Sequence, residues 1–392
     1  MIGLIHGARD LCLPAELGDE RLLPPSEKDM VELVNGRLCV CEGKSSPVTC
    51  TTEARLVDVR YRPSVATSAT YAVRDIHGVE HLVTYKVHLG GRAENRVVGG
   101  RYGDRVRKVC DPLLPYALLP ERMASLWVFP ADPELRGAVR ALNSARTASW
   151  IWSLGLIGDR APSSRGGSVS LEGYEHSRRA VYRVGIDSMG EAGDVSLREF
   201  GLRILPVECA AQSAAMRAQL PALDLPVPRL VGHDAANGWL LEEWTAGVPA
   251  EDGDVSVGAL ALACAAQIHG APLAPGGPSG QPGPRRRLAP MDLLNGIPGI
   301  HRVPDWLWRP LEIPATAWIH GDLHPGRVLI REGGAGLLGL DGLRPGAPEE
   351  DIASWAADVL ARGHTADVEA VLGELEELYS GAGGAPLDPG RL

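Results

Sequence analysis

The stretch Trp318-Ile-His320-Gly-Asp322-Leu-His324-Pro-Gly-Arg327-Val-Leu-Ile330 carries more information about fold and function than the rest of the chain. It places an aspartate between two histidines, on a short turn that apolar residues flank. A second aspartate, Asp341, follows the apolar run Gly336–Leu340. Two short strands joined by the Gly-rich turn Glu332–Gly336 would bring both carboxylates to one edge. Phosphoryl transfer needs this layout, because one carboxylate accepts the proton of the attacking hydroxyl and the other holds Mg²⁺ against nucleotide phosphates.

The segment His320-Gly-Asp322-Leu-His324-Pro-Gly resembles the catalytic loop of the aminoglycoside phosphotransferase and choline kinase branch of the protein-kinase-like fold. Asp341 lies where that family has its metal-binding aspartate. Asp351-Ile-Ala resembles the family's Asp-Leu-Ala, whose aspartate supports the catalytic loop. A single His-x-Asp would be weak, but three matches in the same order are specific. The resemblance implies a bilobal α+β fold, with a β-rich N-lobe and a helical C-lobe, that uses ATP and Mg²⁺.

The loop departs from the family pattern at one position. The family, like protein kinases, has Asn five residues after the catalytic Asp, where it binds a second metal ion, but this chain has Arg327. A guanidinium has only hydrogen-bond donors and cannot ligate Mg²⁺. Either Arg327 contacts a phosphate directly and replaces the charge of that metal ion, or the site has lost its chemistry and kept the fold.

Length and composition fit a globular protein of two or three domains. The chain has 392 residues, 45% of them hydrophobic, and no apolar run approaches the length of a membrane helix. The start Met1-Ile-Gly-Leu4 shows no signal-peptide pattern. A net charge of −10 argues against a general nucleic-acid binder, which needs a basic face. An acidic surface would suit a cationic substrate, but it is also common in cytosolic proteins. We therefore expect a cytoplasmic protein with no membrane or nucleic-acid partner.

The seven cysteines contain no Cys-x-x-Cys motif. Their number is odd, and Cys209 and Cys264 fall in Ala-rich helical segments. We therefore expect reduced thiols, as in cytosolic proteins. A metal site at Cys39, Cys41 and Cys50 is the alternative, although no fourth ligand is evident nearby.

Residues 1–165 are expected to form a β-rich domain. Its strand patterns lie at 56–63, 69–73 and 81–88. Asp75-Ile-His-Gly78 is a hairpin signal, Lys86 lies in the third strand, and a helix pattern follows from Arg92. This is the element order of a small kinase N-lobe, and it recurs in residues 166–247. The first domain is therefore either a divergent repeat of the second, or the two share unrelated hairpins.

Residues 166–247 are expected to form the kinase-like N-lobe itself. Strand patterns at 169–174, 178–184 and 195–198 precede an Ala-rich helix at 207–220. In the resembled fold, a basic residue on the third strand grips the phosphates and pairs with a carboxylate on this helix. Arg198 or, if the strand runs later, Arg203 is the candidate, with Glu208 as its partner. Arg binds phosphate bidentately but is not equivalent to the family's Lys.

The last two strands of this lobe, at 227–234 and 238–244, are followed by Gly247, where the resembled fold has its hinge. Backbone groups of the hinge bind adenine in that fold. Glu242, Glu243 and Trp244 are therefore the candidates for the adenine edge.

Residues 248–392 are expected to form the helical C-lobe. Helix patterns lie at 257–269, 291–307, 351–362 and 366–379. The Pro/Gly-rich segment 271–287 is typical of a flexible connection, and His269 is expected to pack in the core. Within the catalytic loop, Asp322 would orient or deprotonate the acceptor, and His320 would brace the loop. His324 lies nearer the substrate side, and its role stays open.

Two functional hypotheses follow. The first is an ATP-dependent phosphotransferase that acts on a hydroxyl of a small molecule or a peptide Ser or Thr, in resistance or natural-product biosynthesis. Some kinase-like proteins of this type phosphorylate peptides to prepare elimination, but no residue here selects a peptide over a sugar or an aminoglycoside. The second is a catalytically impaired, kinase-like subunit that binds a peptide or a partner enzyme. In that case Arg327 should pair with Asp322 or Asp341, where a metal ion would otherwise lie.

Overall fold

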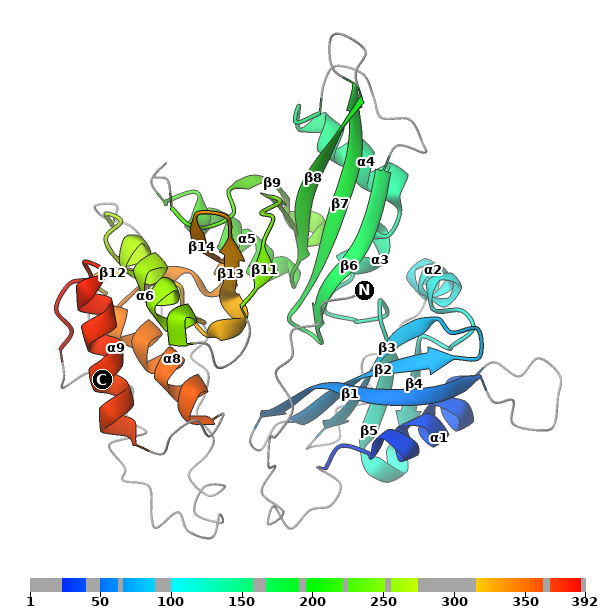
Figure 1. The fold of residues 1–392 in the computed structure, drawn as a ribbon. Helices are drawn as coiled ribbons and strands as arrows, with labels where there is room; N and C mark the ends of the chain where they lie inside the picture. Colours follow the sequence, from blue (N-terminus) through cyan, green and yellow to red (C-terminus); the bar gives the residue numbers. More distant parts are fainter. Residues whose placement is uncertain are drawn as a thin grey trace. The chain divides into compact units, whose positions relative to one another are not determined.

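The computed structural model describes residues 23–39, 50–62, 66–88, 100–157, 167–189, 195–220, 225–250, 255–273, 315–361 and 367–388. They fall into two compact units (Figure 1). The first contains the described residues up to Arg198 together with Ile204–Pro206. The second contains Glu199–Arg203 and the described residues from Val207 onward. The helix expected at 291–307 and most of the connection expected at 271–287 lie outside the described residues.

An antiparallel sheet with two helices forms the N-terminal part of the first unit. Its strands are β1 (Thr51–Arg62), β2 (Ala66–Asp75), β3 (Glu80–His88), β4 (Tyr116–Leu119) and β5 (Ala124–Val128), in the order β1-β2-β3-β5-β4. Ala69, Tyr71 and Val73 lie on one face of β2 and are buried. They share a core with Met30 and Val34 of helix α1 (Glu27–Arg37), as the two-residue period of a strand requires. Helix α2 (Gly100–Cys110) follows β3. The strands predicted at 56–63, 69–73 and 81–88 are confirmed over their described residues, and Pro63 lies outside them.

A second sheet repeats this strand order. It consists of β6 (Gly167–Glu175), β7 (Arg179–Met189), β8 (Val195–Ile204), β9 (Leu230–Asp234) and β10 (Trp239–Glu243), in the order β6-β7-β8-β10-β9. Helix α5 (Val207–Arg217) follows its third strand, as α2 follows β3. The last two strands of each sheet are joined in the same way, by a 3₁₀ turn and one residue in the left-handed region. That residue is Met123 in the first sheet and Gly238 in the second.

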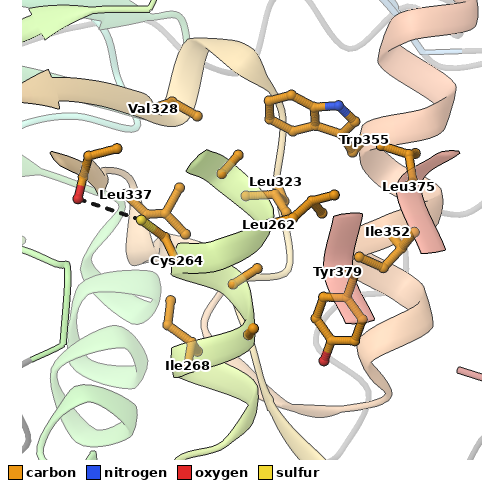
Figure 2. Packing of buried hydrophobic residues seen from close by; sticks show 14 of the residues in the cluster. Leu262, Cys264, Ile268, Leu323, Val328, Leu337, Ile352, Trp355, Leu375 and Tyr379 are labelled. Carbon is orange, nitrogen blue, oxygen red and sulfur yellow. Dashed lines mark hydrogen bonds between the residues drawn. The ribbon is translucent and has the colours of Figure 1, made fainter. Parts of the chain in front are cut away.

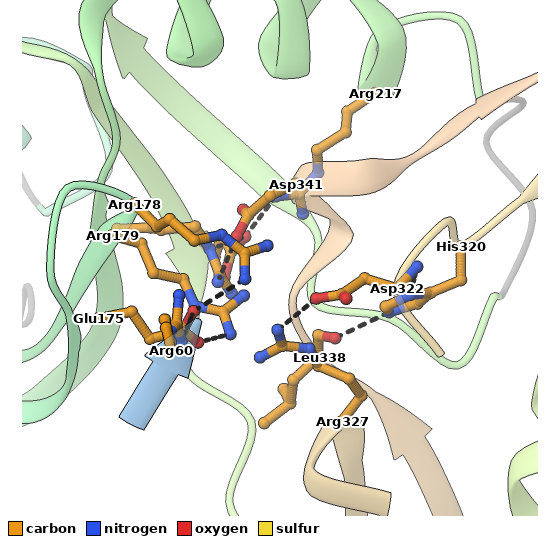
Figure 3. A network of polar contacts seen from close by, with 12 residues as sticks. Arg60, Glu175, Arg178, Arg179, Arg217, His320, Asp322, Arg327, Leu338 and Asp341 are labelled. Carbon is orange, nitrogen blue, oxygen red and sulfur yellow. Dashed lines mark hydrogen bonds and ion pairs between the residues drawn. The ribbon is translucent and has the colours of Figure 1, made fainter. Parts of the chain in front are cut away.

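Ionic and polar contacts within the first unit tie the N-terminal sheet to the β6–β7 turn. Arg60 of β1 lies 2.5 Å from Glu175, whose carboxylate also accepts hydrogen bonds from Arg178 and Arg179 (Figure 3). Asp132, which is fully buried, accepts from the Tyr174 hydroxyl at 3.0 Å and from the backbone N–H of Ser177 at 2.6 Å. Helices α3 (Gly137–Ala141) and α4 (Ser144–Ser153) lie between the two sheets in the sequence.

The second unit contains a helical part with its own core. Helices α6 (Val255–His269), α8 (Pro348–Ala361) and α9 (Val368–Gly381) pack against one another (Figure 1). Leu262, Ile352 and Leu375 are members of the core that they share with the short strands of this unit (Figure 2). The strands that contribute to this core are β12 (Ala317–Ile319), β13 (Val328–Arg331) and β14 (Gly334–Leu337). Strand β11 (Val248–Pro249) pairs with β13, and β15 (Arg344–Gly346) pairs with β12. The helices predicted at 257–269, 351–362 and 366–379 are confirmed over their described residues. The hairpin is confirmed with a shorter turn than the predicted Glu332–Gly336, because β14 already begins at Gly334. Antiparallel sheets combined with helices confirm the predicted α+β class.

The expectation of reduced thiols is wrong for two cysteines. Cys39 and Cys50 form a disulfide, with their Cα atoms 6.1 Å apart. Asn35 brings the two together, because its side-chain oxygen accepts a hydrogen bond from the backbone N–H of Cys50 at 3.0 Å. Cys264, which is buried, and Cys209, which is exposed, are not disulfide-bonded. No helix among the described residues is long and apolar enough to cross a membrane.

Candidate active site

Two loops of the second unit carry the aspartates, and they touch through glycines. Asp322 follows β12, and Asp341 lies in a 3₁₀ turn after β14. Their neighbours Gly321 and Gly342 are packed so closely that a Cβ on Gly321 would lie 2.2 Å from the Gly342 carbonyl oxygen. Gly321 also has a φ of +77°, which favours glycine. The glycines therefore let the two loops that carry Asp322 and Asp341 meet.

Asp351 of α8 fixes the start of the catalytic loop. Its carboxylate accepts hydrogen bonds from the backbone N–H groups of His320 at 2.7 Å and Gly321 at 2.8 Å. The buried His320 side chain adds a second restraint, since its Nε2 lies 2.9 Å from the Leu338 carbonyl oxygen and its Nδ1 lies 3.3 Å from the Asp322 backbone N (Figure 3). These contacts join the segment before Asp322 to the segment before Asp341. They match the bracing roles expected of Asp351 and His320.

His269 extends this support to the C-terminal helix. Its Nε2 lies 3.0 Å from Asp351 Oδ2, and its Nδ1 lies 2.8 Å from the Tyr379 hydroxyl. Burial raises the pKa of Asp351, but the hydrogen bond and charge of His269, the charge of His320 and the Gly321 N–H outweigh it. The net effect holds the Asp351 pKa below its ordinary value. Sequence reasoning assigned His269 to packing alone. The available signal was a histidine closing an otherwise apolar helix.

Arg327 lies against Asp322, the aspartate predicted to act on the acceptor. It is buried, and its Nη2 donates to Asp322 Oδ2 at 2.5 Å (Figure 3). Arg327 reaches this position because the 3₁₀ turn Pro325–Arg327 follows the loop directly, with its backbone N–H bonded to the His324 carbonyl at 2.8 Å. This is the pairing that the binding-subunit hypothesis predicts for Arg327.

Arg203 of β8 lies against the second aspartate. Its Nη1 is 3.4 Å from Asp341 Oδ2, and its Nε and Nη2 donate to the two carboxylate oxygens of Glu242 at 3.3 and 3.2 Å. Burial lowers the pKa of Arg203, but Asp341 and Glu242 outweigh it and raise the pKa above its ordinary value. Of the two predicted candidates on β8, Arg203 is therefore the one beside Asp341.

The structure corrects the expected partner of this basic residue. Glu208 is exposed in the first turn of α5, whereas the carboxylate that pairs with Arg203 is Glu242 of β10. Arg198 is also exposed and donates to the Leu156 carbonyl at 2.5 Å. The sequence contains no local signal for this pair, because Arg203 and Glu242 are 39 residues apart and spacing patterns detect only near neighbours.

The remaining candidates lie at the hinge and in the catalytic loop. Glu242 is buried, and its side chain pairs with Arg203 and Arg217. Glu243 is exposed and pairs with Arg229, and its backbone N–H is bonded to the Arg229 carbonyl at 3.0 Å. Trp244 follows β10 and is half-buried, as is His324 in the catalytic loop.

The residues present fit one metal ion better than two. Mg²⁺ is commonly held by one or two carboxylates together with substrate phosphates, and Asp341 offers a partly exposed carboxylate of this kind. At the position of the family's second metal ligand, Arg327 offers donors only. Among the described residues, no group of three or more His, Cys, Asp or Glu side chains is arranged to hold a metal ion alone. A metal ion here would therefore depend on nucleotide phosphates.

Three solved structures show limited similarity to the chain. Choline kinase from Cryptosporidium parvum is 10% identical, with 56% of this chain and 73% of that chain covered and a TM-score of 0.33. Amicoumacin kinase hAmiN, in complex with AMP-PNP, Ca²⁺ and Ami, is 13% identical, with the same coverage and a TM-score of 0.36. Ethanolamine kinase from Plasmodium vivax is 9% identical, with 74% of this chain and 88% of that chain covered and a TM-score of 0.36.

All three TM-scores lie below 0.5, so the assignment rests on sequence. No curated protein matches the chain. A family model, described as the phosphotransferase enzyme family, matches residues 172–389, which is more than half of the chain and includes both aspartate loops. The resemblance found in the catalytic loop is thereby confirmed, and the chain belongs to the phosphotransferase enzyme family.

Proposed function

We propose that this protein transfers the γ-phosphate of ATP to a hydroxyl, either of a small molecule or of a Ser or Thr in a peptide. Family membership supports phosphoryl transfer. The observation that carries the proposal is the contact between the two aspartate loops through Gly321 and Gly342. Loops held this close would let Asp322 and Asp341 act on the same phosphate group.

Asp322 would orient the acceptor hydroxyl and accept its proton while the hydroxyl oxygen bonds to the γ-phosphorus. The bond from the γ-phosphorus to its bridging oxygen breaks, and the electron pair leaves with ADP, so that the products are ADP and a phosphate ester. Arg203 would balance the negative charge that shifts onto the bridging oxygen. Because charge neutralisation and positioning provide most of the catalysis in such reactions, a strong base is not required.

Mg²⁺, bound by Asp341 and the phosphates, would supply further neutralising charge. Arg327 would hold the Asp322 carboxylate in place and contribute the positive charge that the family obtains from a second metal ion. The backbone of Glu242, Glu243 and Trp244 would bind the adenine edge, and His324 would contact the acceptor.

Residues 1–165 are proposed to be a divergent copy of the N-lobe at 166–247, followed by the C-lobe at 248–392. The support is the shared strand order of the two sheets and the shared left-handed residue before their last strands. We also propose that the acceptor comes from resistance or natural-product chemistry. A partner biosynthetic enzyme and a cytoplasmic location are proposed with it.

The pairing of Arg327 with Asp322 favours a second candidate function, a kinase-like subunit that binds a peptide or partner enzyme without catalysis. In that case the arginine neutralises the carboxylate where an acceptor hydroxyl would lie. Asp341 is likewise paired, with Arg203. The two candidates make different predictions about nucleotide and about turnover.

A thermal-shift titration with ATP and Mg²⁺ tests nucleotide binding. A ligand at 100 times its Kd stabilises a folded protein by about 2.7 kcal/mol, so a clear rise in Tm is expected, and Asp341→Asn should reduce it. No shift at millimolar nucleotide in a folded sample would refute nucleotide binding. A shift without any ADP release, in the presence of alcohols, aminoglycosides and Ser- or Thr-containing peptides, would favour the binding subunit.

A further inference from the structure

A buried row of alternating charges runs through the second unit to Asp341. Arg217 of α5 contacts Glu242, Glu242 contacts Arg203 with both of its oxygens, and Arg203 contacts Asp341. Only 4% of Arg203, 5% of Glu242 and 7% of Arg217 is exposed. Arg217 is anchored independently, since its Nη2 also donates to the Pro228 carbonyl at 2.5 Å.

The buried charge that helix α5 contributes is opposite to the one expected. A carboxylate was predicted on the helix after the third strand, but that helix presents Arg217, and the carboxylate comes from β10. Burial raises the pKa of Glu242, but Arg203 and Arg217 lower it by more. The net effect holds the pKa of Glu242 below its ordinary value. A buried charge held by two opposite charges is costly to move, because each broken pair leaves an uncompensated ion.

The two contacts of Glu242 with Arg203 restrict the guanidinium strongly. A bidentate pair fixes both the position and the plane of an arginine. With Nε and Nη2 engaged, Nη1 is the group directed to Asp341. Phosphates held beside Asp341 would meet a guanidinium whose orientation is already set, which saves the entropy of ordering it during binding.

We propose that Glu242 is a positioning residue, which aims Arg203 at the nucleotide phosphates beside Asp341 and does so from β10 instead of from the helix. This inference rests on the proposed nucleotide binding. A purely structural role is the competing explanation, in which Glu242 only neutralises two buried arginines. The two differ because positioning affects ligands that carry phosphates and spares ligands that lack them.

The test compares ATP with adenosine, by calorimetric titration in the presence of Mg²⁺. Glu242→Gln keeps the shape of the side chain and removes its charge. If Glu242 positions Arg203, the Kd for ATP should rise about tenfold or more, which corresponds to about 1.4 kcal/mol or more, while the Kd for adenosine stays unchanged. Glu349→Gln is the matched control, because Glu349 is equally buried, at 5% exposure, and lies in α8. The Glu349→Gln variant should bind ATP and adenosine with the same Kd values as the wild type.

Glu242→Asp provides a second variant that keeps the buried charge if the glutamine variant does not fold. Its shorter side chain cannot hold Arg203 in the same bidentate way, so ATP should still bind more weakly and adenosine equally well. Equal losses for both ligands, or no loss for either, would overturn the positioning role and leave the proposed function intact. A wild-type protein that binds no ATP would overturn both.

Discussion

Each aspartate of the site has one arginine beside it, but the two pairs are held differently. Arg203 is held by Glu242, and its Nη1 lies 3.4 Å from Asp341 Oδ2. Arg327 contacts Asp322 directly, at 2.5 Å, from the same short loop. Removing Arg327 should therefore act on Asp322 itself, whereas removing the Arg203 contact should act on the phosphates.

Asp322→Asn should abolish phosphoryl transfer and spare nucleotide affinity. The amide keeps the shape of the carboxylate but cannot accept the proton, and general-base groups contribute about 10²- to 10⁴-fold to rate. Turnover and the Kd for ATP should be measured on the same preparation. Asp341→Asn is the contrasting variant, since it should weaken the Mg²⁺-dependent binding of ATP. Near-native turnover in Asp322→Asn would show that Asp322 is not the proton acceptor.

Arg327→Ala should weaken ATP binding or turnover by about 1.5–3 kcal/mol if its charge serves catalysis, as expected for a lost charge-assisted hydrogen bond. Arg327→Asn rebuilds the family's metal ligand and should partly restore function, with a steeper dependence on Mg²⁺ concentration. In a binding subunit, Arg327→Asn should leave partner binding intact and raise metal affinity. Identical Mg²⁺-dependent affinities in the wild type and both variants would contradict any role for Arg327 in the site.

At the scale of elements, the catalytic loop depends on the close approach of two backbones. Gly321→Ala should destabilise the protein by more than about 1 kcal/mol, because the Cβ collides with the Gly342 carbonyl and a positive φ is unfavourable for Ala. Gly373→Ala in helix α9 is the matched control, as no atom lies within 4 Å of an added Cβ there. It should stabilise by roughly 0.5–1 kcal/mol. Urea unfolding measures both, and a neutral Gly321→Ala would disprove the tight contact.

Asp351 links helix α8 to the catalytic loop, and this link should depend on pH. Its pKa is lower in the folded protein than its ordinary value. It therefore contributes stability that is fully present above the unfolded-state pKa, about 3.9, and is lost as pH falls through the lowered folded-state pKa. Asp351→Asn should be less stable than the wild type at pH 6. The difference should shrink in acid, below pH 4, in unfolding curves measured across that range. A constant difference would contradict the linkage.

At the scale of the whole molecule, each unit has its own hydrophobic core. Leu126 belongs to the core of the N-terminal sheet, and Leu262 to the core of the helical part, both with 0% exposure. Leu-to-Ala changes in cores cost about 2–5 kcal/mol. Leu126→Ala and Leu262→Ala should therefore lower different calorimetric transitions, since compact units with separate cores can unfold separately. If both variants lower one common transition, the cores unfold together.

The catalytic loop, the β13–β14 hairpin and most helices were predictable because their signals are local. The order His320, Asp322, Asp341 and Asp351 lies within one short part of the chain, and strand and helix periods extend over a few residues. The cap and hairpin signals are equally local. Asp75, for example, accepts hydrogen bonds from the His77 and Val79 N–H groups, as an Asx turn requires.

The sequence by itself determined the α+β class and the family, and it predicted the two aspartates of the candidate site, since neighbouring residues carry each of these signals. Only the tertiary structure decided which side chains hold them. Arg203 meets Glu242 across 39 residues and Asp341 across 138, and His269 meets Asp351 across 82. Glu208 is nearer to Arg203 in sequence, but Arg203 pairs with Glu242. Burial removes water as a competing partner, so the geometry of the packed strands selects the ion pair.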